Sequence, residues 1–334
     1  MREAPQSDIA ARARARLIPL YATLELTHRC NLACVHCLLE GHSGEELSTT
    51  EAKEVIDQLA EAGTLELVLT GGEALLRPDF FDLAAHARER HLAVTLLTNG
   101  TLIDRRAADA LKELRPLGVH LSLYGVTGAV HEAVTGTPRS FERTLAGIHL
   151  LLEWGLRVQI NSLAMRQNVK EIPLLDHFCR ERRLPLNLAP SLFPTIKGSL
   201  KPYAYLLEDA DLEGHLAWEE ASGRRGGGLE GVCNAGFCNV AVSPLGEVFP
   251  CNALRLLAGN VRAEPLGLIW QGSPVFRWLR RLTLEDFEVC ASCSLLSLCP
   301  RCPGQTLGKG KSILYPSSQA CKVAKYRELF YREP

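Results

Sequence analysis

The sequence predicts an α/β fold, in which a partial (β/α)6 TIM-like barrel is followed by a cysteine-rich C-terminal extension. From about residue 21 to residue 191, short β-prone apolar segments alternate with longer helical patterns at a spacing of roughly 30 residues. Polar or cysteine motifs lie within or just after five of the six expected strands, and we expect them at the carboxyl rim, where barrel enzymes carry their active sites. Six units are too few to close an eight-stranded barrel, so we expect an open one.

The six expected strands are apolar and rich in residues that favour strands. In chain order they are Tyr21–Thr27, Leu65–Thr70, Ala93–Thr98, Val119–Tyr124, Arg157–Ala164 and Leu186–Pro190. The helical patterns between them are Thr49–Ala62, Phe80–Glu89, Asp104–Leu114, Phe141–Glu153 and Asn168–Arg182. Ser48 and Glu51 form a capping box that specifies where the first of these helices begins. Strand–helix–strand repetition predicts right-handed crossovers and a parallel sheet.

The chain divides into four expected segments. They are an N-terminal helical segment (1–16), the barrel (17–191), a bridging region (192–228) and a cysteine-rich domain (229–334). The bridging region is rich in proline, glycine and charge, and its stretch Arg224–Gly228 lacks the Lys-Ser/Thr of a phosphate-binding loop. In the last segment, short strands at Val240–Ser243 and Glu247–Phe249 lie among cysteines, so we expect metal to hold it together.

Composition restricts where the protein works. Of the 334 residues 46% are apolar and 22% charged, which are ordinary values for a globular protein. A formal net charge of -1 provides no general attraction to nucleic acid or to an anionic membrane. The chain has no apolar run near the ~20 residues of a membrane span and no apolar signal-peptide core. We therefore expect a cytoplasmic protein that binds neither nucleic acid nor a membrane.

The cysteines carry the chemistry. In a reducing compartment, twelve cysteines indicate metal or redox chemistry rather than disulfides. Cys30, Cys34 and Cys37 form C-x-x-x-C-x-x-C, and three thiolates can hold three irons of a cubane cluster while the fourth iron stays without a protein ligand. An open coordination position distinguishes a catalytic site from a closed structural one. Cys179 stands alone in a helical pattern, where we expect a buried core thiol.

The triplet, with His36 before its last cysteine and Gly71-Gly72-Glu73 further on, resembles the radical S-adenosylmethionine (SAM) enzymes. The C-terminal cysteine pattern resembles the SPASM extension of the branch that mainly modifies peptides and proteins. Together the two resemblances cover about residues 17–326. They imply a 4Fe–4S cluster on the triplet and SAM bound to the open iron. They also imply a 5′-deoxyadenosyl radical that abstracts hydrogen from an unactivated carbon.

The resemblance also implies roles for cofactor-binding residues, although it assigns no catalytic residue. Gly71 and Gly72 would let the backbone approach the methionyl group, and Glu73 would hold its ammonium. Ser122 matches a position that contacts ribose or carboxylate, Arg143 is a partner for the methionine carboxylate, and Asn161 contacts ribose. Purely structural roles compete with these, because Glu73 could cap a turn, Asn99-Gly100 is a turn signal, and Ser122 and Asn161 could be ordinary polar residues at strand ends.

The family pattern divides the remaining eight cysteines into two auxiliary iron–sulfur clusters, which we expect to be 4Fe–4S. The first takes Cys233, Cys238, Cys251 and Cys302, and the second takes Cys290, Cys293, Cys299 and Cys321. Four thiolates for each cluster leave no open iron, which favours electron transfer or structural support. Two departures from the sulfatase-maturing members are the short spacing Cys299-Pro-Arg-Cys302 and Asn252 in place of an aspartate proposed as a base. An amide cannot accept a proton at neutral pH. We therefore expect a peptide modification other than formylglycine-type dehydrogenation.

Three hypotheses follow. The first is an enzyme that crosslinks, oxidises or epimerises a peptide or protein. It would receive electrons from a reductase such as flavodoxin or ferredoxin. If a leader peptide is recognised, we expect a separate leader-peptide-binding protein or the barrel itself to bind it, because only about 20 residues precede the first strand. The second hypothesis keeps this chemistry for a small molecule such as a sugar or aminocyclitol. The third is a non-catalytic scaffold whose C-terminal cysteines bind zinc.

Overall fold

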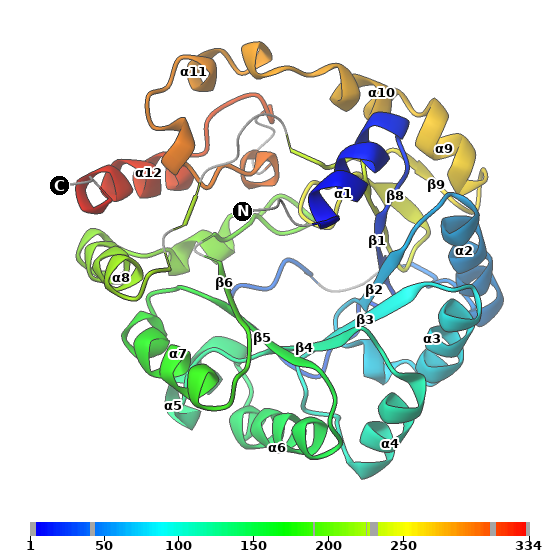
Figure 1. Cartoon of the computed structure of the whole chain (residues 1–334), viewed down its shortest axis with the longest axis horizontal. Coiled ribbons are helices and arrows are strands. Elements are labelled where there is room, and N and C mark those ends of the chain that lie inside the picture. The colour runs from blue at the N-terminus through cyan, green and yellow to red at the C-terminus, as the bar shows by residue number, and fades with distance from the viewer. Residues whose placement is uncertain are drawn as a thin grey trace.

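A computed structural model describes residues 5–40, 44–189, 191–224, 226–227, 233–307 and 312–331. Its six N-terminal strands are parallel and lie side by side in chain order (Figure 1). Their bounds are β1 (Tyr21–Glu25), β2 (Glu66–Thr70), β3 (Ala93–Thr98), β4 (Gly118–Ser122), β5 (Val158–Leu163) and β6 (Leu186–Ala189). The prediction of an open, partial (β/α)6 barrel is confirmed. Pro190, the last residue of the sixth expected strand, lies outside the described residues.

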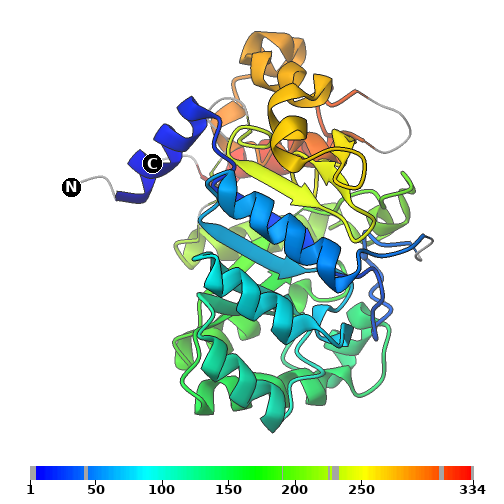
Figure 2. The ribbon, with the colours of Figure 1, turned by 90° about the vertical axis from the view of Figure 1, so that its right-hand side faces the viewer.

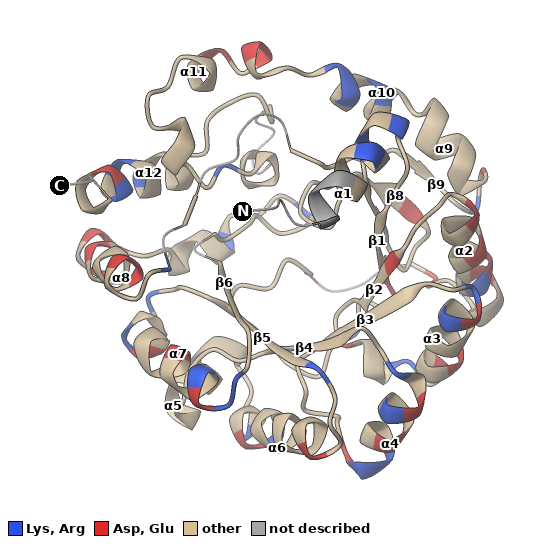
Figure 3. Cartoon of the chain, viewed as in Figure 1, with Lys and Arg blue, Asp and Glu red and all other residues tan. Residues whose placement is uncertain are grey.

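Helices surround the barrel strands, and the charged residues of this part of the chain gather on their outer faces (Figures 1 and 3). The helices are α2 (Thr49–Glu61), α3 (Phe80–Glu89), α4 (Arg105–Leu114), α5 (Gly128–Thr135), α6 (Ser140–Glu153) and α7 (Ile172–Glu181). The expected capping box is present, since Ser48 Oγ accepts from the Glu51 amide and the Glu51 carboxylate accepts from the Ser48 amide. The short helix α5 was not predicted, and two 3₁₀ turns, η1 (Ala74–Leu76) and η2 (Val169–Glu171), precede α3 and α7.

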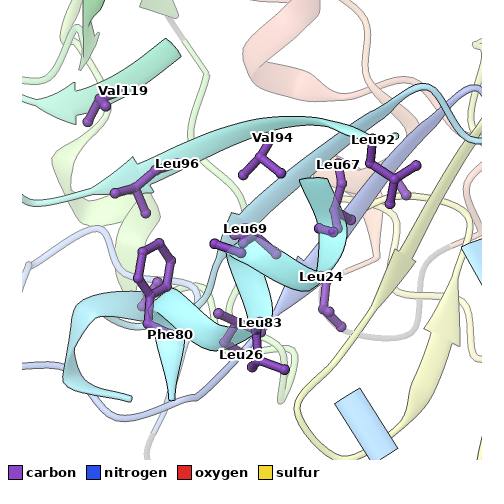
Figure 4. Close-up of a cluster of buried hydrophobic side chains, with 14 of the residues drawn as sticks. Leu24, Leu26, Leu67, Leu69, Phe80, Leu83, Leu92, Val94, Leu96 and Val119 are labelled. Atoms are coloured by element: carbon purple, nitrogen blue, oxygen red, sulfur yellow. The ribbon is translucent and has the colours of Figure 1, made fainter. Parts of the chain in front are cut away.

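The main core lies between these strands and helices. Leu67, Leu69 and Leu96 point from β2 and β3 toward Phe80 and Leu83 of α3, and all five side chains are buried (Figure 4). Each fully buried leucine or phenylalanine contributes about 1.5–3 kcal/mol relative to an exposed one. The same core includes Cys179, which is completely buried and whose thiol pKa is raised to about 12 by burial. Cys179 is therefore the core thiol that we expected.

The cysteine-rich region continues the sheet of the barrel. Strand β7 (Asn239–Val242) pairs in parallel with β1, and β8 (Glu247–Phe249) and β9 (Gly259–Asn260) follow it in antiparallel fashion. In Figure 2 the yellow strands of this region extend the blue barrel strands, with orange and red helices beyond them. The sheet therefore has nine described strands, in the order β6-β5-β4-β3-β2-β1-β7-β8-β9, and the two expected domains share it.

The bridging region is more regular than a linker. It contains a 3₁₀ turn, η3 (Lys201–Tyr205), and the helix α8 (Asp209–Ala221), whose buried Leu212 and Leu216 recur at helical spacing. Helix α8 packs on the C-terminal helix α12 (Ser318–Phe330), where the carboxylate of Glu219 lies 3.6 Å from the Arg327 guanidinium. Arg225 and Gly228 of the arginine–glycine stretch lie outside the described residues.

The remaining elements are helical. They are α1 (Pro5–Arg16), which is the expected N-terminal helix, α9 (Leu266–Gly272), α10 (Pro274–Arg281), α11 (Glu288–Ala291), and the 3₁₀ turns η4 (Leu284–Asp286), η5 (Leu296–Leu298) and η6 (Pro303–Thr306). Among the described helices, none is both long enough and apolar enough to span a membrane.

Candidate functional site

A cavity of about 410 Å³ lies at the carboxyl ends of the barrel strands. The strand register explains how its wall is assembled. Glu25 at the end of β1 is the direct neighbour of Thr70 at the end of β2, and Ser122 on β4 is the direct neighbour of Asn161 on β5. All four residues line the cavity. In a parallel sheet the strand ends meet at one edge, so polar residues far apart in the sequence surround one space.

The three N-terminal cysteines face this cavity from the loop after β1. The thiol of Cys34 has its pKa raised to about 12, mainly by burial and further by the negative charges of Cys37 and Cys30. Burial also raises the pKa of the Cys30 thiol, with Cys37 again among the nearby negative groups. Cys37 and Cys30, as thiolates, would disfavour ionisation of Cys34, and a positively charged partner would offset that cost. The three thiols fit a metal cluster, which would bind them as thiolates.

Helix α5 holds the cysteine loop in place. The amides of Ala33 and Val35 donate to the carbonyls of Thr135 and Val134 at 3.0 Å each. Within the described part of the chain, no three His, Cys, Asp or Glu side chains are grouped around a position for a single metal ion. A cubane cluster does not require such a grouping, because each thiolate binds a different iron.

The Gly71-Gly72-Glu73 turn packs directly on the segment that leads to Cys30. The Gly72 amide donates to the Thr27 carbonyl at 2.7 Å. A Cβ at Gly71, where φ is +138°, would lie 2.2 Å from the Thr27 carbonyl oxygen, and one at Gly72 would lie 2.3 Å from that of Arg29. Both glycines also line the cavity. The structure thus gives them a first role within the chain itself, which is to bring two loops into contact beneath the cysteines.

Glu73 lies behind the cavity wall. It is 1% exposed and is not among the described lining residues. Its carboxylate accepts from the Leu75 amide at 3.1 Å, the Thr98 hydroxyl at 2.8 Å and the Asn99 amide at 2.8 Å. Burial raises the pKa of this carboxyl, while those hydrogen bonds lower it. Glu73 therefore caps η1 and fixes the end of β3, and its contact with the cofactor ammonium stays a prediction.

The motif Thr98-Asn99-Gly100 joins the β3 end to the cysteine loop. The Asn99 side-chain amide donates to Asn31 Oδ1 at 2.9 Å and lies 3.9 Å from Cys30 Sγ. Thr98 and Asn99 both line the cavity. Of the other residues expected to bind the cofactor, Ser122 and Asn161 line the cavity. Arg143 does not: it is exposed on α6, and its Nε donates to the Arg139 carbonyl at 3.2 Å. Their roles toward the cofactor stay predictions.

Sequence reasoning missed several residues of the cavity wall. Tyr124 is buried, and its hydroxyl lies 3.0 Å from Nε2 of His36. Burial lowers the pKa of His36 to about 4, so at neutral pH this imidazole stays neutral within the cysteine triplet. His120 shares the cavity-facing side of β4 with Ser122. His120 could have been predicted from its position two residues before Ser122, because residues two apart on a strand point to the same face.

Glu25 and Arg255 form the second missed feature. The Arg255 guanidinium donates to Glu25, although the two residues are 230 positions apart, and both line the cavity. The pKa of Glu25 is lowered overall, because hydrogen bonds from His28 and Arg255 outweigh its burial. The sequence offered a signal for Glu25, because a glutamate within a mainly apolar strand is a candidate for a functional residue. No local pattern marked Arg255.

The eight C-terminal cysteines separate electrostatically into two groups. In the first, Cys233 raises the thiol pKa of Cys238, Cys251 and Cys302, and Cys251 also raises that of Cys302. In the second group the thiol pKa of Cys299 is raised by Cys321, Cys290 and Cys293, and that of Cys321 by Cys290 and Cys293. Burial is the largest cause for each of these five shifted thiols. These groups have the same members as the two expected ligand sets.

A partial (β/α)6 barrel with three thiols at its active face and two further cysteine groups defines an iron–sulfur enzyme. Residues 24–179 match the radical SAM superfamily, and residues 233–294 match the iron–sulfur cluster-binding SPASM domain. The chain belongs to the radical SAM superfamily. The cofactors of these two domains are SAM, the 4Fe–4S cluster that binds it, and auxiliary iron–sulfur clusters.

Two relatives and one solved structure are similar over most of the chain. The AdoMet-dependent heme synthase of Methanosarcina barkeri is 32% identical over 85% of this chain and 91% of its own length. The mycofactocin maturase MftC of Mycobacterium tuberculosis is 31% identical over 84% of this chain and 77% of its own. Streptococcus suis SuiB bound to its precursor peptide SuiA shares the fold, with a TM-score of 0.73 and 20% identity over 96% of this chain and 82% of that one.

Proposed function

We propose that this radical SAM enzyme abstracts hydrogen from an unactivated carbon of a peptide or protein and thereby crosslinks, oxidises or epimerises it. Support comes from the SPASM domain, from the similarity to a mycofactocin maturase, and from the fold shared with a peptide-bound enzyme. When bound, the cluster and SAM supply the 5′-deoxyadenosyl radical. The chain's own residues hold these groups, exclude water and admit the substrate.

Each part of the cavity wall has a task in this proposal. Cys30, Cys34 and Cys37 would hold the cluster and would leave one of its irons free for SAM. The backbone of Gly71 and Gly72 would let the methionyl group approach, Ser122 would contact the ribose or carboxylate, and Asn161 would contact the ribose. Glu73 supports this arrangement through Thr98 and Asn99. The two C-terminal cysteine groups would hold auxiliary clusters that serve electron transfer or structural support. Arg143 lies outside the described cavity lining, so this proposal gives it no contact with the cofactor.

The observation that carries the choice of a peptide is the similarity to the mycofactocin maturase over 84% of this chain, and the size of the cavity is compatible with a peptide. About 410 Å³ is near the lower end of the range for small-molecule sites, and here one space must contain SAM as well as the reacting group. A peptide can meet this condition by inserting a single side chain while its backbone stays outside. Apolar residues of the wall, among them Leu97, Leu163 and Leu192, would surround that side chain and keep water away.

A second candidate keeps the radical chemistry and acts on a small molecule. The heme synthase relative, which this chain matches over 91% of that protein's length, supports a tetrapyrrole as this molecule. A sugar or aminocyclitol has no comparable support among the relatives named here. The third hypothesis, a zinc scaffold without catalysis, would require the C-terminal cysteine groups to bind zinc and the radical function to be lost.

Anaerobic reconstitution tests the proposal. The enzyme should bind about twelve irons, as expected for three cubane clusters, and should form 5′-deoxyadenosine from SAM with a flavodoxin, ferredoxin or chemical reductant. A short peptide encoded beside the gene for this chain should then change mass, with a leader-binding protein added if one is encoded there. Mass change of an iron tetrapyrrole instead of any peptide would favour the second candidate; iron coproporphyrin, which is the product in the name of another relative, is a suitable one. Zinc without iron and without deoxyadenosine would refute both.

A further inference from the structure

A second cavity, also of about 410 Å³, adjoins the cofactor cavity. We refer to the two as the outer and inner cavities. Two chain segments pass from one wall to the other, because Phe193 and Asn252 line the inner cavity while their successors Pro194 and Ala253 line the outer one. Arg255 lines both. A substrate that reaches from the outer to the inner cavity therefore passes this arginine.

Arg255 is held in a fixed orientation at this junction. Its Nε donates to the Asn252 carbonyl at 2.9 Å, and its Nη2 donates to Oε1 of Glu25, which belongs to the inner wall. The guanidinium also lies over the Phe249 ring, 5.0 Å from its centroid. Within the described residues, Nη1 has no hydrogen-bond partner. The arginine side chain is 14% exposed, so donors remain available on a group whose position is already set.

The outer cavity is cationic. Its charged lining residues are Arg255 and the exposed Lys197, and its described lining contains no aspartate or glutamate. The only carboxylate near Arg255 that lines either cavity in the described chain is Glu25, on the inner side. A cleft lined by charges of one sign concentrates ligands of the opposite sign.

We propose, as a refinement of the peptide or small-molecule function above, that the outer cavity is a substrate subsite in which Arg255 and Lys197 bind a carboxylate. Arg255 takes the carboxylate on the side away from Glu25, and its planar fork suits this group. The bound carboxylate would hold the substrate so that a neighbouring carbon enters the inner cavity. An acidic side chain or C-terminus of a peptide and the acid side chains of a tetrapyrrole offer the same chemistry, so experiment must distinguish these sources.

A purely structural role for the Glu25–Arg255 pair makes a different prediction. If the pair only connects β1 to the loop after Cys251, removing either partner should disturb the site in the same direction. If Arg255 binds substrate, Glu25 competes with the substrate for its positive charge. Glu25→Gln keeps an acceptor for the arginine and removes that competition, so it should tighten carboxylate binding.

Direct binding to the oxidised holoenzyme saturated with SAM provides the test, because no turnover occurs without a reductant. The probes are a fluorescent glutamate-rich peptide, its glutamine counterpart, and iron coproporphyrin. Arg255→Gln should weaken binding of the recognised carboxylate about 10- to 100-fold, and Lys197→Gln about 2- to 5-fold. Lys112→Gln, the same charge change at an exposed position on α4, is the control and should leave binding unchanged.

Each outcome is decisive. A glutamate peptide that depends on Arg255 supports the subsite with a peptide substrate, and iron coproporphyrin with the same dependence supports it with a tetrapyrrole. Equal binding by wild type, Arg255→Gln and Lys197→Gln overturns the proposal, as does weakening by Glu25→Gln to the same extent as by Arg255→Gln. Deoxyadenosine formation by the same preparations reports separately on the radical function. If deoxyadenosine forms normally but carboxylate binding does not depend on Arg255, the subsite is refuted and the radical function is not.

Discussion

Replacing Gly72 by alanine should damage the cofactor site while leaving the rest of the molecule folded. The new Cβ would lie 2.3 Å from the Arg29 carbonyl oxygen and 2.7 Å from that of His28. Both atoms belong to backbone that leads to Cys30, so no flexible side chain can move aside. To reach ordinary van der Waals contact, the Gly72 loop and the segment before the cysteines must separate by roughly 1 Å.

The cost of this overpacking should be about 1–3 kcal/mol. If the separation is absorbed at the cofactor site, SAM affinity should fall roughly 10- to 100-fold. Equilibrium dialysis with labelled SAM on the anaerobic enzyme measures this, and iron analysis should show that the C-terminal clusters are retained. Gly214→Ala is a matched control, because a Cβ at Gly214 in α8 meets nothing within 4 Å. That change should stabilise the helix by about 1 kcal/mol. Wild-type SAM affinity in Gly72→Ala would refute the role given to this contact.

Three further predictions concern other parts of the molecule. Replacing Cys30, Cys34 and Cys37 together by alanine should abolish deoxyadenosine formation but spare the auxiliary irons, and retained SAM cleavage would show that the site is elsewhere. Thr98→Val removes the hydroxyl that donates to both oxygens of the buried Glu73, so denaturant unfolding should show a loss of about 1–3 kcal/mol, whereas an unchanged midpoint would contradict the role of Glu73. Arg262→Gln breaks the exposed ion pair that joins the segment after β9 to Glu51 at the start of α2 and should cost at most about 1 kcal/mol. This pair holds the Glu51 pKa at about 2, below its usual value. The loss of unfolding free energy in Arg262→Gln should therefore be constant above about pH 5 and shrink as the pH falls toward 2. A loss of unfolding free energy that grew in acid would contradict this role of the ion pair.

The parts of the fold that were predicted correctly depend on local signals. The capping box at Ser48 and the apolar periodicity of the barrel helices specify each element from neighbouring residues, and four of the expected barrel helices begin and end within one residue of the observed bounds. The parallel order of six strands followed from their repetition with helices. Helix α8 was missed because surrounding proline, glycine and charge concealed the helical spacing of Leu212 and Leu216.

The site could be predicted only where its chemistry is contiguous in sequence. The cysteine triplet and the glycine pair are short motifs, and they line the cavity. Glu73 shows the limit of such a motif, since its carboxylate is directed at Thr98 and Asn99 rather than into the cavity. The pairing of Glu25 with Arg255 depends on β7 joining the barrel sheet beside β1, and no pattern within either segment indicates that tertiary contact.

The most direct measurement of the central claim is electron paramagnetic resonance of the reduced cluster held by Cys30, Cys34 and Cys37. It should be recorded with and without SAM labelled with ¹⁵N in its amino group, in a variant whose auxiliary clusters have been removed. Because three cysteines leave one iron without a protein ligand, SAM should alter the spectrum, and the labelled nitrogen should show hyperfine coupling to the cluster. A spectrum that SAM does not change, with no nitrogen coupling, would mean that the fourth iron is already occupied and would contradict the account.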